Sequence, residues 1–157
     1  MTLSTFGWIH TLLSLLALVA GIVVVIGLFS PRNLDAWTAI FLVTAVATSA
    51  TGFGFAFDHF MASHWVGVIA LVVLAVAILA RYVFHLAGAW RWIYAVSIVV
   101  SEYFLALVAV AQAFKKVPAL AAMPQAEAYV QIAVLLIFIV VGIAAARAYR
   151  PAVAATA

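Results

Sequence analysis

Five long stretches of the sequence are almost entirely apolar, and the short segments between them hold nearly all of the charge. Each contains about 19 to 24 residues, and roughly 20 helical residues cross a hydrocarbon core. The pattern predicts an all-α fold, an integral membrane bundle of five transmembrane helices. It forms one domain, residues 1–150, followed by a disordered tail, residues 151–157. The expected spans are Phe6 to Phe29, Trp37 to Phe57, His64 to Phe84, Trp92 to Phe114 and Ala128 to Ala146. The longest loop between them is expected from Lys115 to Glu127, with Pro118 and Pro124.

The composition excludes several classes of function. Of the 157 residues, 71% are hydrophobic and 7% are charged, whereas roughly 25% charged residues is usual in soluble domains. The absence of cysteine excludes disulfides, cysteine-ligated metals and thiol catalysis. No P-loop, H-E-x-x-H or G-x-S-x-G motif is present, and this absence favours a protein that is not an enzyme. The basic residues are scattered singly at span ends, which argues against a nucleic-acid partner.

The distribution of these basic residues predicts an orientation in the membrane. The side that carries the first and third loops and the carboxyl terminus would hold five arginines, whereas the other side would hold two lysines. Because cytoplasmic loops carry the excess of positive charge, we expect the N-terminus outside and the C-terminus in the cytoplasm. The residues concerned are Arg32, Arg81, Arg91, Arg147 and Arg150 on one side, and Lys115 and Lys116 on the other.

Two expected spans carry stripes of small or hydroxyl residues at helical spacing. Such stripes allow helices to pack closely, with the hydroxyl groups bonded to their own backbone. They are Gly7, Ser14, Ala17 and Gly21 in the first span, with His10 set into the stripe, and Thr44, Thr48 and Thr51 in the second.

Glu102 lies about midway along the fourth apolar stretch. An ionised carboxylate at that depth costs several kcal/mol unless it is paired. We expect Glu102 either to be neutral at pH 7 or to contact an internal water pocket with Ser97, Ser101 or Tyr103. It is a candidate proton-binding or ligand-binding residue, and a neutral acid bonded across a helix interface is the alternative.

Three histidines gather towards the outer side of the expected bundle. His10 and His64 come from different spans and could bind a b-type haem through its two axial positions. Together with His59 and Asp58 in the turn between spans, they could instead hold copper or zinc. Ordinary hydrogen bonding by these histidines is the default interpretation.

Basic residues also cluster at the opposite, inner side. Arg81 and His85 are one helical turn apart, and Arg91 follows shortly after them. They are candidates for contact with lipid phosphate or with the acidic groups of a partner, although cations at a span end also extend to the surface for solvation alone.

Two segments carry a resemblance to known proteins. The first reads RYVFHLAGAWRWIY, from Arg81 to Tyr94, and the second reads QAFKKVPAL, from Gln112 to Leu120. They resemble signatures of a group of uncharacterised bacterial multi-pass membrane proteins. The resemblance implies a small helical protein of the bacterial cytoplasmic (inner) membrane and carries no activity. Ser101 and Glu102 depart from the pattern of this group.

We favour a non-catalytic accessory, assembly or self-associating component of the membrane. It would be surrounded by membrane lipids, as a homo-oligomer or as a subunit of a larger membrane complex. The first alternative is a redox protein that binds haem or a metal through the outer histidines. The second alternative is a small proton-linked transporter that uses Glu102.

Overall fold

The computed structural model describes residues 4–30, 34–55 and 62–151, so the expected tail lies outside the described residues apart from Pro151. All regular structure in these ranges is helical. The long helices are α1 (Thr5–Gly27), α2 (Asp35–Gly52), α3 (Ala62–Ile78), α4 (Trp90–Lys116) and α6 (Pro124–Ala148). A π-helical segment, η1 (Leu79–Val83), extends α3, and the short helix α5 (Pro118–Ala121) joins α4 to α6.

Four helical segments are long and apolar enough to cross a membrane: Thr5–Gly27, His64–Val83, Trp90–Lys116 and Pro124–Ala148. The helix α2 corresponds to the second expected span and is not among them. It begins with Asp35 and contains four threonines, which lower its hydropathy. The protein is therefore an all-helical bundle with four candidate membrane spans, as expected of a multi-pass membrane protein.

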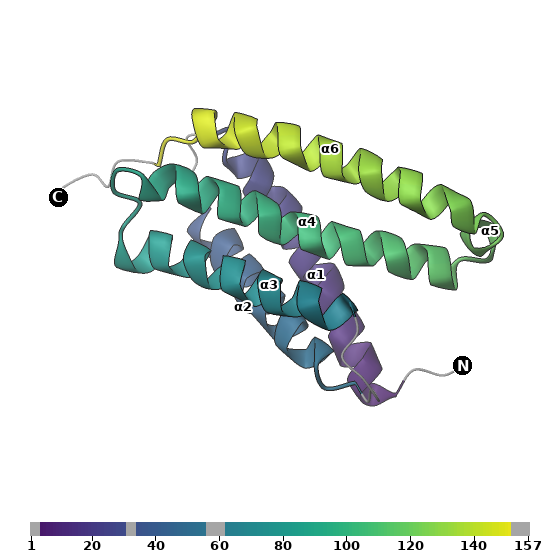
Figure 1. Cartoon of the computed structure of the whole chain (residues 1–157). Helices are drawn as coiled ribbons and strands as arrows, with labels where there is room; N and C mark the ends of the chain where they lie inside the picture. The colour runs from purple at the N-terminus through teal and green to yellow at the C-terminus, as the bar shows by residue number, and fades with distance from the viewer. Residues whose placement is uncertain (1–3, 31–33, 56–61, 152–157) are drawn as a thin grey trace.

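The helix α4 is the centre of the arrangement. It packs against α1, α3 and α6, whereas α2 lies between α1 and α3. Figure 1 shows α4 and α6 side by side as a hairpin with α5 at its tip, while α1 crosses behind them. The helix α6 packs mainly on α4 and so forms the edge of the bundle.

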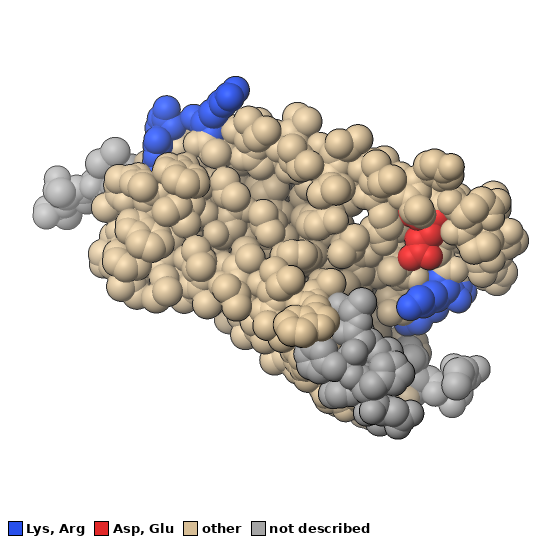
Figure 2. Space-filling model, in the orientation of Figure 1, with Lys and Arg blue, Asp and Glu red and all other residues tan. Residues whose placement is uncertain are grey.

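Small side chains line the helix interfaces. Ala17, Ala20, Ala77 and Ala95 are completely buried, and such residues let helix backbones approach closely. The outer surface carries large apolar side chains, and Val140, for example, is 67% exposed. Figure 2 shows charged side chains only towards the two ends of the visible face. This distribution suits a bundle whose middle contacts acyl chains.

The segment between Lys115 and Glu127, expected to be the longest loop, is mostly helical. That expectation was wrong because it took Pro118 and Pro124 as loop residues. Both prolines occupy the first turn of a helix, α5 and α6 respectively, where the missing N–H of proline costs no hydrogen bond.

At the end of the bundle that carries most of the arginines, a polar cluster ties four segments together. Arg81 of η1 forms an ion pair with Asp35 at the start of α2. The Arg81 guanidinium carbon also lies 5.5 Å from the ring centroid of Tyr94 in α4. Tyr149 lies just beyond α6, and the centroid of its ring is 5.6 Å from that of the Tyr94 ring. The backbone carbonyl oxygen of Tyr149 accepts a hydrogen bond of 3.1 Å from Nη1 of Arg91. The cluster therefore fixes the carboxyl-terminal end of α6 against the rest of the bundle.

Burial raises the pKa of Tyr149 to about 12 from an ordinary value of 10.0. Between these values the unfolded chain loses the phenolic proton while the folded protein keeps it, so stability falls as the pH rises through this window. Phenylalanine has no phenolic proton, so in Tyr149→Phe the free energy of unfolding should fall less with rising pH. The difference from the wild type should be up to about 2–3 kcal/mol. Thermal unfolding in mild detergent between pH 9 and 12 measures the effect.

Tyr129→Phe is the matched control, because Tyr129 is 74% exposed. It should leave the pH dependence unchanged. Equal pH dependence of the wild type and Tyr149→Phe would contradict the assignment.

Candidate functional site

The side chain of Glu102 is buried in the interior of the bundle. Only 2% of Glu102 is exposed. A Cβ atom built on Gly21 of α1 would lie 1.8 Å from the Oε2 atom of Glu102 and 2.7 Å from Cε2 of Phe41 in α2. The carboxyl group of α4 therefore occupies the space that the absent side chain of Gly21 leaves, and Phe41 borders the same space. This contact is possible only because residue 21 is glycine.

No hydrogen-bond partner of Glu102 Oε2 lies among the described residues. The Oγ atom of the adjacent Ser101 is likewise buried without one. The ion pair found in the described parts of the chain is Arg81–Asp35, so no described cation pairs with Glu102. An unpaired ionised carboxylate in such a place is costly, whereas a neutral acid is tolerated. A neutral Glu102 stays a prediction.

Other buried polar residues share the interior with Glu102. The hydroxyl of Thr44 bonds to its own helix, because its Oγ1 donates to the Ile40 carbonyl oxygen at 2.7 Å. Such a bond satisfies a buried hydroxyl group. The Oγ1 of Thr48 is buried and has no partner in the described part of the chain. Polar groups therefore occur at several depths on α2 and α4. The buried set is Thr38, Thr44 and Thr48 of α2 with Ser97, Ser101 and Glu102 of α4.

The first expected stripe packs as predicted. Gly7, Ala17 and Gly21 are buried, and α1 makes extensive contact with α2. The Oγ of Ser14 donates to the carbonyl oxygen of His10 at 2.7 Å, so the predicted backbone bonding of the hydroxyl groups is confirmed there.

The ring of His10 bonds to the end of α2. Its Nδ1 lies 2.9 Å from the Oγ1 of Thr51, and that hydroxyl donates its own proton to the Ala47 carbonyl oxygen at 2.7 Å. When the Thr51 proton points to Ala47, Nδ1 of His10 is the donor in this hydrogen bond and Nε2 carries the lone pair. The Phe55 ring packs edge-on against His10 at a centroid distance of 5.0 Å.

His64 is buried at the start of α3 and lies against the same end of α2. Its ring centroid is 5.6 Å from that of Phe53. Asp58 and His59 fall outside the described residues. Across residues 4–30, 34–55 and 62–151, no group of three or more metal-ligating side chains could hold a metal ion. Haem or metal binding by His10 and His64, with Asp58 and His59, stays a prediction.

The three inner-side candidates lie in different environments. The partly buried Arg81 pairs with the exposed Asp35 and lies over the ring of Tyr94, and Arg91 bonds the backbone at Tyr149. His85 is exposed in the turn between η1 and α4, where its φ of 48° is left-handed. Their contact with lipid or a partner stays a prediction.

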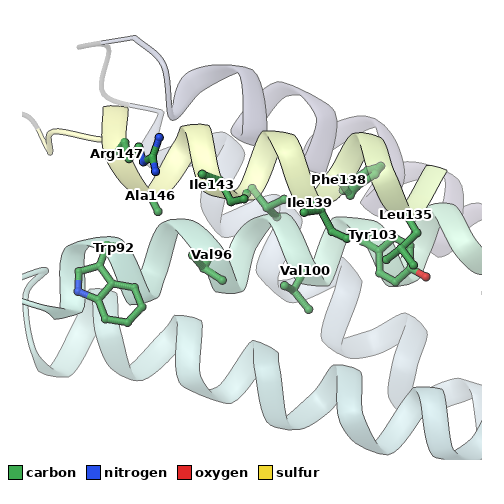
Figure 3. Close-up of a pocket in the computed structure, with 12 residues that line it drawn as sticks. Trp92, Val96, Val100, Tyr103, Leu135, Phe138, Ile139, Ile143, Ala146 and Arg147 are labelled. Atoms are coloured by element: carbon green, nitrogen blue, oxygen red, sulfur yellow. The ribbon is translucent and has the colours of Figure 1, made fainter. Parts of the chain in front are cut away.

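Sequence reasoning missed a groove of about 380 Å³ between α4 and α6. Figure 3 shows its side chains converging from the two helices. Gly142 and Ala146, one turn apart on α6, help to line it. That small-residue pair was the available signal, but it could not show which helix would face it.

No protein-family model, curated protein or solved structure matches this chain.

Gly21→Ala should destabilise the fold by about 1–3 kcal/mol, because the added Cβ overlaps the carboxyl group of Glu102. Removing that carboxyl group by Glu102→Ala should relieve this overlap, while the close approach to Cε2 of Phe41 remains. The double variant should then lose less stability than the sum of the two single variants. Thermal unfolding in mild detergent measures all three variants.

Gly142→Ala is the matched control, because a Cβ there would meet nothing nearer than Val99 Cγ1 at 3.7 Å. It should keep or slightly raise the unfolding midpoint. Additive losses in the Gly21 and Glu102 pair would refute the contact.

Proposed function

We propose that the chain crosses the bacterial cytoplasmic membrane five times, with its N-terminus outside and its C-terminus in the cytoplasm. The crossing that adds to the four candidate spans is α2, which packs between α1 and α3 with its threonines turned inward. Its outer residues are apolar, and Val43 is 67% exposed. The arginine bias of one side supports the orientation.

We propose further that the protein is a small proton-linked transporter in which Glu102 binds and releases the proton. The observation that carries this proposal is a buried carboxyl group at the interface of three helices, whose Oε2 has no partner in the described part of the chain. Ionisable residues inside membrane bundles mark proton relays and ion pathways. This departs from our first preference, a non-catalytic component, because helix packing alone does not require a carboxyl group at this position.

The contact with Gly21 connects the proton to helix packing. With the proton bound, Glu102 is neutral and α1 rests directly on its carboxyl group. Release of the proton leaves a charge between the Gly21 backbone and the Phe41 ring, which favours separation of α1 from α4 and entry of water. Protonation of Glu102 therefore biases the bundle between a closed and an opened packing.

Buried hydroxyls lie on α4, which carries the acid, and on α2, whose Phe41 borders the same space. Ser97 and Ser101 share the helix of Glu102, and Thr48 is a buried hydroxyl of α2. Hydroxyl groups both donate and accept, so they suit a chain of proton transfers once water enters.

The decisive variant is Glu102→Gln, which keeps the size of the side chain but cannot exchange a carboxyl proton. In liposomes with an entrapped pH-sensitive dye, a potassium diffusion potential should drive proton uptake through the wild type. Glu102→Gln should abolish this uptake. Glu127→Gln, in the first turn of α6, is the control and should leave it intact.

Dicyclohexylcarbodiimide, an apolar reagent that adds to protonated carboxyl groups, provides an independent measurement. Mass spectrometry should find the adduct on Glu102 in the wild type and none in Glu102→Gln. Proton uptake that is equal in the wild type, in Glu102→Gln and in empty liposomes would refute the transport function. Absence of the adduct would refute a protonated acid.

A non-catalytic, self-associating or accessory component is the second candidate. Its support is α6, which packs mainly on α4 and leaves Leu136, Ile137 and Val140 more than half exposed. A protein that is isolated in gentle detergent as a monomer without co-purifying proteins would count against it.

A further inference from the structure

The groove between α4 and α6 lies on the outside of the bundle and changes character along its length. Its walls are apolar over most of that length. In Figure 3, Trp92 and Arg147 lie at one end and Tyr103 lies towards the other. Tryptophan and arginine are typical of the boundary between the hydrocarbon core and the headgroups. The groove therefore runs from the membrane surface inward.

Its length is that of one leaflet. The wall on α4 extends from Trp92 to Tyr103, about 17 Å at roughly 1.5 Å per helical residue. A hydrocarbon core is roughly 30 Å thick, so one leaflet accounts for about half of it. A single acyl chain covers this distance. A transmembrane helix of a second copy would need a groove along the whole of α6.

Positive charge gathers at the surface end of the groove. Arg147 lines the groove and is exposed. Arg91 and Arg150 each donate a hydrogen bond of 3.1 Å to the carbonyl oxygen of Tyr149, so their guanidinium groups lie close together. Among the residues that the structure describes, none of these three arginines pairs with a carboxylate. A phosphate group would complement them.

The geometry points to a binding site for an anionic phospholipid, with one acyl chain in the groove and the phosphate at Arg147. Arg91 and Arg150 add positive charge beside it. Gly142 keeps the groove open, because it contributes no side chain to the space between α4 and α6. This site goes beyond the proton function and does not involve Glu102.

Native mass spectrometry of the whole protein in mild detergent tests the site. The probes are dioleoylphosphatidylglycerol, which is anionic, and dioleoylphosphatidylcholine, which has the same chains and no net charge. We expect the wild type to bind the anionic lipid more tightly. Arg147→Gln should weaken that binding about fivefold, since each cation near an anionic lipid surface contributes on the order of 1 kcal/mol.

The matched control for charge is the double variant Lys115→Gln with Lys116→Gln. It removes positive charge at the far end of α4 and should leave the affinity unchanged. An equal loss in this control and in Arg147→Gln would overturn the site. So would equal affinity of the wild type for the two lipids.

Two further comparisons test the acyl chain. Gly142→Leu fills the groove and should abolish binding, whereas Gly142→Ala should retain it. Dihexanoylphosphatidylglycerol, with the same headgroup and short chains, should bind the wild type more weakly, and this comparison does not depend on how a variant folds. Equal affinity for short and long chains would overturn the groove as the chain site.

A second copy of the protein seated in the groove would appear as a dimer that Gly142→Leu dissociates, and it would also overturn the proposal. Glu102→Gln should keep the wild-type affinity for the anionic lipid. The lipid site and the proton function can therefore fail separately.

Discussion

A polar group within a hydrocarbon phase has no water to bond to, and the whole arrangement of this chain depends on that constraint. Backbone groups satisfy it by forming helices, which account for all regular structure in the described ranges. Side chains satisfy it by turning inward, as the threonines of α2 do, or by bonding their own helix. Four buried polar atoms find no partner among the described residues, and the Oε2 of Glu102 is the one that belongs to an ionisable group.

Glu102 joins the fold to the proposed chemistry. The helix α4 is packed on several sides, and α1 reaches it closely because Gly21 leaves room for the carboxyl group. The same contact makes the packing of α1 sensitive to the charge on Glu102. The two proposals occupy different faces of α4, since the acid faces inward and the lipid groove faces α6.

Much of the fold was predictable, because hydropathy and helical period are local properties. The apolar stretches correspond to the long helices, and the stripe with Gly21 is a packed face. The second span was harder to recognise from hydropathy, because polar residues that turn inward lower the hydropathy of α2 just as exposed ones would. The prolines at 118 and 124 were misread because a proline both ends one helix and starts another.

By itself, the sequence determined the class of structure and the position of the acid along its helix, since both follow from the order of polar and apolar residues. Tertiary structure alone decided what each group meets: Gly21 against Glu102, Thr51 against His10, Asp35 against Arg81, and α6 along one side of α4. Those pairings depend on the rotation and register of one helix against another. Rotation and register result from the packing of many side chains at once, and no single segment encodes them.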